Sequence, residues 1–119
     1  MAKEWSILLK NKRYELEKAD DEAYKLRNQK EHLADFITQF KAFHYNECAL
    51  LEEEMELCAH SDVLPFINTQ LTEVEDQHSK QYRTLLRYQE EFEMKIQEQS
   101  KETSKIEKEL TALEKEARL

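Results

Sequence analysis

The chain has 119 residues, of which 37% are charged, one is proline and none is glycine, a composition typical of long helices rather than sheets. Its formal net charge of −8 disfavours nucleic acid as a partner, because binding to phosphates depends on Lys and Arg. Apolar runs fall far short of the ~18 residues of a membrane span, so we expect no direct membrane insertion, and two cysteines without a secretion signal favour the cytoplasm.

The first predicted helix covers about residues 3–59 and carries apolar side chains at alternating steps of three and four residues. This spacing keeps them on one side of the helix, as in the seam of a coiled coil. Lys12 and Lys30 interrupt the series, and the succession 40, 44, 48 is a stutter, which locally unwinds a left-handed supercoil. The predicted seam positions are Trp5, Leu9, Leu16, Ala19, Ala23, Leu26, Leu33, Ile37, Phe40, His44, Cys48, Leu51, Met55 and Cys58.

Residues 60–65 form the predicted turn, which contains the only proline of the chain, Pro65. Proline fits the first turn of a helix but not its interior, so we expect a helix to begin at Pro65. Ser61 or Asp62 can supply the N-cap oxygen. Because this break divides the chain into arms of similar length, it predicts a hairpin. The alternative is one long helix that is kinked at Pro65 and dimerises along its length.

The second predicted helix covers about residues 65–118 and repeats the same spacing, with a stutter at 88, 92, 96. The two helices together predict an all-α fold, a long antiparallel two-helix coiled-coil hairpin that forms a single domain over residues 1–119. The seam positions of this helix are Ile67, Leu71, Val74, His78, Gln81, Leu85, Tyr88, Phe92, Ile96, Gln99, Thr103, Ile106, Leu110, Leu113 and Ala117.

A second apolar stripe accompanies the seam only in the middle of the chain, where one helix has apolar residues every seven positions. Two helices bury one narrow seam, so a wider apolar face indicates either packing against a second copy or a partner-binding surface. The stripe consists of Phe36, Phe43, Leu50 and Leu57, and Tyr82, Leu86 and Met94 add apolar surface on the other arm.

The charge is unevenly distributed along the chain. Residues 42–79 contain nine acidic residues and no Lys or Arg, so this segment carries −9 and the remainder of the chain +1. Such a segment is either a solvated helix face or a surface that attracts a basic partner.

No motif in the sequence predicts catalysis, and we expect neither enzyme activity nor a cofactor. A Gly-rich phosphate loop and a nucleophile elbow are both missing, and carboxylates on an exposed helix keep ordinary acidity. His44 and Cys48 are spaced as two metal ligands on one helix face, but Cys58 and His60 point apart, so we expect no metal site. The two cysteines lie ~15 Å apart along one helix, too far for a disulfide.

The middle of the chain resembles a known family. Ile67, Leu71, Val74 and His78 follow the +4, +7, +11 series that begins the second helix of the FliJ family of flagellar export-apparatus coiled-coil proteins. The companion series of the first helix is matched at Leu33, Ile37, Phe40 and His44, although the family favours Gln at the first of these positions and Tyr at the last two. The start of the chain, Trp5-x-x-Leu8-Leu9-x-x-Lys12-Arg13, is also similar. The YscO-like proteins of virulence secretion systems share the architecture.

The resemblance implies a non-enzymatic, monomeric stalk similar to the central stalk subunit of rotary ATPases. It implies that this stalk lies in the cytoplasm beside the inner-membrane export apparatus and binds the export ATPase hexamer, the membrane export gate and export chaperones. The implied gate-binding residues are Leu33, Ile37, Phe40, His44, Ile67, Leu71, Val74 and His78, and the implied ring-binding residues are Trp5, Leu9, Leu16, Ile106, Leu110 and Leu113.

Two alternatives follow from the same residues. The periodicity places the gate-binding series in the seam, whereas gate binding needs several of them exposed, so the stripe of Phe36, Phe43, Leu50 and Leu57 is an alternative seam. The alternative function is a coiled-coil scaffold or secretion chaperone, which clasps a helical partner or forms a homodimer.

Overall fold

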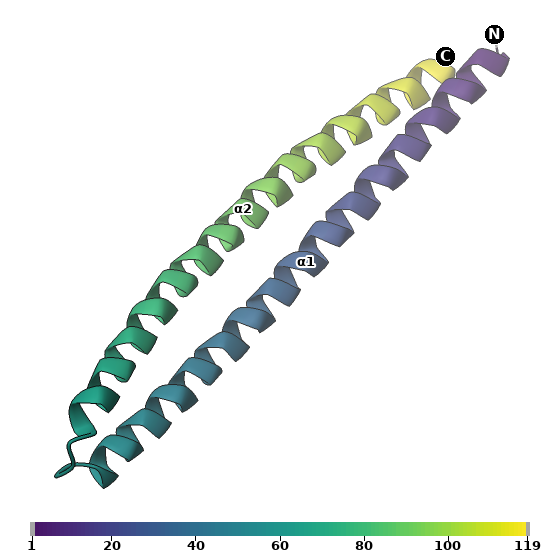
Figure 1. Cartoon of the computed structure of the whole chain (residues 1–119). Coiled ribbons are helices and arrows are strands. Elements are labelled where there is room, and N and C mark those ends of the chain that lie inside the picture. Colours follow the sequence, from purple (N-terminus) through teal and green to yellow (C-terminus); the bar gives the residue numbers. More distant parts are fainter. Residues whose placement is uncertain (1, 119) are drawn as a thin grey trace. The chain divides into compact units, whose positions relative to one another are not determined.

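The computed structural model describes residues 2–118, and the end residues 1 and 119 of the predicted hairpin lie outside this range. It contains helix α1 (Ala2–Leu57), a turn over residues 58–63, and helix α2 (Leu64–Arg118), with no strand in the described range (Figure 1). The predicted all-α antiparallel hairpin is confirmed. The alternative of a single kinked helix is wrong, because six residues without helical structure separate α1 from α2.

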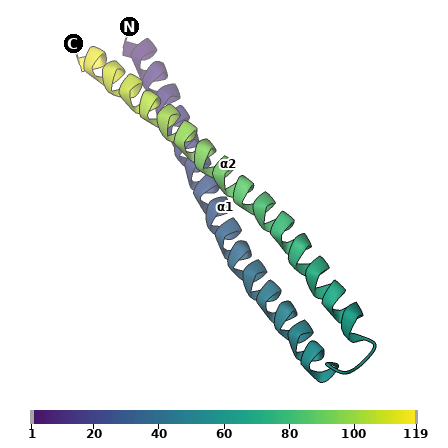
Figure 2. The ribbon, with the colours of Figure 1, turned by 90° about the vertical axis from the view of Figure 1, so that its left-hand side faces the viewer.

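The packing divides the chain into two compact units, each of which contains a segment of both helices. The terminal unit combines residues 2–30 with 91–118, and the turn unit comprises residues 31–90. Within each unit the α1 and α2 segments lie side by side in both views (Figures 1 and 2).

The N-cap residue of α2 differs from the prediction. Val63, rather than Ser61 or Asp62, is the N-cap residue of α2, because its carbonyl oxygen accepts the first helical hydrogen bond, from the Ile67 N–H at 3.1 Å. The Ser61 hydroxyl instead accepts a hydrogen bond from the Val63 N–H at 3.2 Å. Pro65 is therefore the second residue of α2, where its missing N–H leaves no helical bond unmade.

The chain reverses direction without glycine because the turn needs no left-handed residue. α1 ends at Leu57, two residues before the predicted end, and the Ser61 N–H then donates to the Cys58 carbonyl at 2.9 Å. A further bond joins the Leu64 N–H to the Ser61 carbonyl at 3.2 Å. No described residue has a positive φ angle, the backbone region that only glycine adopts freely.

The seam of α1 follows the predicted positions throughout. Every predicted position from Trp5 to Met55 is buried or half-buried, as is Cys58 just beyond the end of α1, and Ala19 and Ile37 are the least exposed at 6%. The two polar interruptions, Lys12 and Lys30, are also half-buried. The seam is therefore continuous through these lysines, whose alkyl chains cover apolar surface while their ammonium groups reach carboxylates.

The seam of α2 differs from the prediction near its middle and at its last position. The predicted seam residues Gln81, Tyr88 and Ala117 are exposed, and Tyr82 and Gln89 are half-buried instead. The seam therefore runs 74, 78, 82, 85, 89, 92, and the stutter is centred on residue 78 rather than on 92. This places the stutter of α2 opposite that of α1, because the rings of His44 and His78 lie 3.9 Å apart.

Ion pairs connect the two helices in the terminal unit. The Lys12 ammonium donates to the Glu109 carboxylate at 2.6 Å and to Glu15 at 3.0 Å. These hydrogen bonds raise the pKa of Lys12, Glu109 contributing most, and the bond from Lys12 lowers the pKa of Glu109. Two further pairs link the helices, Arg13 with Glu114 at 3.8 Å and Lys30 with Glu93 at 3.5 Å.

Candidate partner-binding surfaces

The centre of the turn unit holds two imidazoles in the seam and one carboxylate at its edge. His78 packs against His44, with ring centroids 3.9 Å apart, and against Phe40 at 5.0 Å. Its Nε2 lies 3.0 Å from a carboxylate oxygen of Glu47, while its Nδ1 is buried without a hydrogen-bond partner among the described residues. No local sequence pattern indicates the Glu47 contact, because residues 47 and 78 are 31 positions apart along the chain.

Cys48 extends this cluster without gaining reactivity. Its Sγ lies 3.6 Å from Nδ1 of His44. Burial raises the pKa of the Cys48 thiol, and the carboxylates of Glu75, Glu52 and Glu47 raise it further. A thiol with a raised pKa stays protonated near neutral pH and is a poor nucleophile and metal ligand. Both Cys48 and Cys58 are free thiols.

The described part of the chain contains neither a metal-ligand cluster nor a membrane-spanning helix. Residues 2–118 contain no group of three or more His, Cys, Asp or Glu side chains arranged to hold a metal ion. No helix in the same range is long and apolar enough to cross a bilayer.

The eight residues that the resemblance assigns to the export gate lie together along the seam of the turn unit. Ile37 is buried, and the other seven are half-buried. The alternative seam is wrong, because Phe36, Phe43, Leu50 and Leu57 are 52%, 64%, 63% and 75% exposed. Contact with a gate protein at these eight positions would therefore involve only the edges of side chains that already hold the helices together.

The exposed apolar stripe runs along one flank of α1. Residues seven apart lie on one helix face, so Phe36, Phe43, Leu50 and Leu57 form a row with one member every two turns. Tyr82 does not widen this row, because its ring lies 5.0 Å from the Lys41 ammonium. Lys41 and Phe43 are two residues apart and so point to opposite flanks of the helix, which places Tyr82 on the flank away from the stripe. Leu86 lies one turn beyond Tyr82 on the same face of α2, so it does not widen the stripe either.

The exposed stripe is bordered by carboxylates. Glu47, Glu53 and Glu54 each lie three or four residues from a member of the stripe, which is the spacing of neighbours on a helix surface. Glu47 also contacts His78, whereas Glu53 and Glu54 are exposed and form no ion pair within the described range.

In the terminal unit, the residues that the resemblance assigns to the ATPase ring also lie in the seam. Ile106 is 7% exposed, and Trp5, Leu9, Leu16, Leu110 and Leu113 are half-buried. The apolar side chains that this unit exposes near the start of α1 are Ile7 and Leu8, at 56% and 48%.

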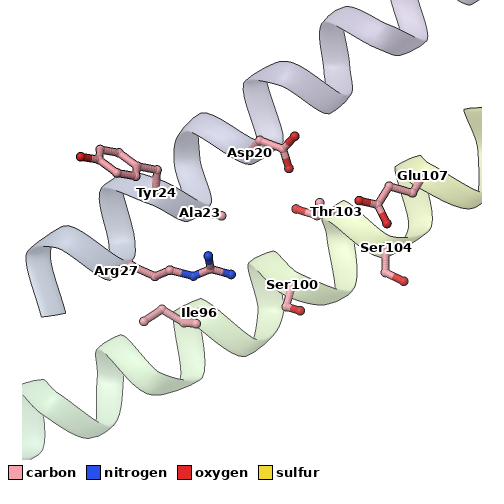
Figure 3. A pocket seen from close by; sticks show the side chains of 9 residues that line it. All are labelled: Asp20, Ala23, Tyr24, Arg27, Ile96, Ser100, Thr103, Ser104 and Glu107. Atoms are coloured by element: carbon pink, nitrogen blue, oxygen red, sulfur yellow. The ribbon is translucent and has the colours of Figure 1, made fainter. Parts of the chain in front are cut away.

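The terminal unit also has a shallow groove of about 550 Å³ between its two helix segments (Figure 3). Arg27 reaches across towards α2, whereas Tyr24 points away from it. Acidic, basic and hydroxyl groups line the groove, among them Asp20, Ser100 and Glu107. The groove is open to solvent, so it lacks the desolvation that shifts a carboxyl towards acid–base chemistry.

The structure thus offers two kinds of contact surface, a seam that joins the helices and an exposed apolar stripe with an acidic border. The series that carry the family resemblance belong to the first kind, and the stripe belongs to the second. No family model, curated protein or solved structure matches the chain.

Proposed function

We propose that this protein is a non-enzymatic stalk of a flagellar or related type III protein export apparatus. In this proposal it lies in the cytoplasm beside the inner membrane, and it links the export ATPase hexamer to the export gate and to export chaperones. The observation that supports it best is the pairing of the two resembling series. His44 and His78 end these series in the sequence, and the centroids of their rings lie 3.9 Å apart between the facing helices.

The exposure of the side chains agrees with a binding role. Catalysis depends on groups that are desolvated and held in a pocket, whereas this hairpin presents nearly all of its charged groups to water. In the stalk proposal, the exposed side chains beside the seam make the contacts with partners. Ile7 and Leu8 are the apolar candidates for contact with the ATPase ring.

The test is the effect of the purified protein on the ATPase of its own secretion system. The wild-type protein should increase hexamer assembly and ATP hydrolysis. An Ile7→Ser/Leu8→Ser variant should need about tenfold more protein for the same increase, because interface energy is concentrated in a few apolar anchors. Tyr24→Ser is the matched control, since Tyr24 is 71% exposed in the same unit. A wild-type protein that leaves both assembly and hydrolysis unchanged would contradict the proposal.

A homodimeric scaffold is the second candidate, because exposed apolar side chains such as those of the stripe also occur at dimer interfaces. Light scattering at micromolar concentration separates the two candidates. The stalk proposal expects the mass of one chain, and the scaffold expects the mass of two.

A further inference from the structure

We infer that the stripe of Phe36, Phe43, Leu50 and Leu57 is a docking surface for a basic amphipathic helix of a partner protein. This inference does not depend on the export proposal, because it uses the exposure and charge of the turn unit alone. It concerns residues other than the eight that the family resemblance assigns to the gate.

The apolar part of the argument is the exposure of four large side chains in one row. All four are more than half exposed, and only the Phe43 ring lies near a ring of the seam, with its centroid 6.4 Å from that of His78. A regular seven-residue repeat on an exposed face is what a partner helix with the same repeat fits. The row spans residues 36–57, which corresponds to ~33 Å of helix at 1.5 Å per residue.

The charge around the stripe selects the partner. Glu47, Glu53 and Glu54 border it, and residues 42–79 contain no Lys or Arg that could neutralise them from within. The only Lys or Arg ion pair found for this segment in the described range is at its end, between Asp76 and Lys80. A helix with Lys or Arg beside its apolar face would supply the missing positive charge.

The same charge argues against other occupants. Two copies joined through their stripes in parallel would bring all three glutamates of one copy against those of the other, and an antiparallel pair would bring the two Glu47 residues together. An anionic lipid surface would be repelled for the same reason. The basic helix is the occupant for which both the apolar row and its acidic border are favourable.

Binding can be measured by fluorescence anisotropy with the full chain and a labelled peptide of about 22 residues, which matches the length of the stripe. The peptide is an amphipathic helix with Leu on one face and Lys on the other. A second peptide has Glu in place of every Lys. We expect the Lys peptide to bind, and the Glu peptide to bind at least about tenfold more weakly.

Substitutions then locate the site. Phe43→Ser/Leu50→Ser should weaken binding of the Lys peptide about tenfold, because it removes the centre of the apolar row. The matched control is Tyr45→Ser, since Tyr45 is 75% exposed on the same helix and points away from Phe43. This control should change the affinity by less than about twofold.

The acidic residues are tested separately. Glu53→Gln/Glu54→Gln should weaken binding of the Lys peptide and reduce the dependence of that binding on NaCl between about 50 and about 300 mM.

A measurement on the wild-type protein gives an independent map. Carbodiimide joins a carboxylate to a lysine in direct contact, so the Lys peptide should be cross-linked to Glu47, Glu53 or Glu54. Cross-links mainly in the terminal unit would overturn the inference. Equal binding of the two peptides, or equal losses for the Phe43→Ser/Leu50→Ser and Tyr45→Ser variants, would also overturn it. A dimer that Phe43→Ser/Leu50→Ser dissociates would assign the stripe to a second copy and likewise overturn it.

Discussion

His44 and His78 are unusual members of a coiled-coil seam, because each imidazole brings polar atoms into a place that leucine normally fills. The Nδ1 atom of His78 is buried without a partner in the described structure, and only Nε2 is satisfied, by Glu47. An unpaired buried polar atom costs stability, whereas an apolar side chain of similar size does not. The histidine pair therefore makes the hairpin less stable than a pair of leucines at these positions would.

Replacing both residues should reveal this cost. We expect His44→Leu/His78→Leu to raise the free energy of unfolding by about 1–3 kcal/mol, since the variant removes an unpaired buried atom and fills the seam. Urea denaturation followed by circular dichroism measures the change. Glu47→Gln is the control for the hydrogen bond, because it leaves both imidazoles in place. A double variant less stable than the wild type would show that the imidazole contacts are favourable overall.

The Lys12–Glu109 pair makes stability depend on pH at both extremes. The lowered pKa of Glu109 adds stability above the ordinary carboxyl value of 4.5, and this is lost as the pH falls through the folded-state value. The raised pKa of Lys12 adds stability below the ordinary value of 10.5, and this is lost as the pH rises. The pair therefore contributes fully only between these two values.

This pH window can be tested with one substitution. Glu109→Gln should lower the melting temperature at about pH 7 and leave it unchanged at about pH 2, where the wild-type carboxyl is protonated as well. Circular dichroism melts supply both values. Glu102→Gln is the matched control, because Glu102 is exposed on the same helix and forms no ion pair in the described range. A melting-temperature difference that persists at low pH would assign the effect to packing rather than charge.

The turn depends on the hydroxyl of Ser61 and not on the carboxylate of Asp62. Ser61→Ala removes the hydrogen bond from the Val63 N–H and should cost ~1 kcal/mol of unfolding free energy, the net contribution of a typical hydrogen bond. Asp62→Ala should cost much less, because Asp62 makes no side-chain hydrogen bond among the described residues. Chemical denaturation of the two variants compares them directly, and equal costs would contradict the assignment.

Periodicity was sufficient to predict α1 but not all of α2. Between residues 78 and 92, the pairs 81/82 and 88/89 each offer one Gln and one Tyr to the seam, so the spacing of α2 alone permits either member. The facing helix decides between them. α1 has its stutter at His44, and two helices that supercoil together must unwind at the same level, which moves the stutter of α2 to His78.

At the scale of the whole molecule, the two units differ in how charge acts on them. The terminal unit has ion pairs between its helices, whereas residues 42–79 of the turn unit carry nine acidic groups and no Lys or Arg. Salt screens attraction and repulsion alike, with a Debye length of ~10 Å at 0.1 M. Added salt should therefore loosen the first unit and tighten the second.

Amide hydrogen exchange measured by mass spectrometry tests this contrast. Raising NaCl from about 0.05 M to about 0.5 M should slow exchange in residues 42–79 and speed it in the terminal unit. An unstructured peptide measured alongside corrects for the effect of salt on intrinsic exchange. A change of the same sign in both units would show that their charges do not govern local opening.

The candidate surface was only partly visible in the sequence. The seven-residue repeat identified Phe36, Phe43, Leu50 and Leu57, but it did not decide whether they join the two helices or face solvent. The answer depends on whether α2 covers the stripe or the neighbouring seam row of α1, and this is decided by how the two helices pack together. The contact between Glu47 and His78 depends on the same pairing, and no local pattern signals it.

The lack of Lys and Arg around the turn also governs how the protein is cut. Trypsin cleaves after these two residue types, so it has no target between Lys41 and Lys80. Complete digestion releases residues 42–80 as one peptide that contains the whole reversal of the chain, with the end of α1 still joined to the start of α2.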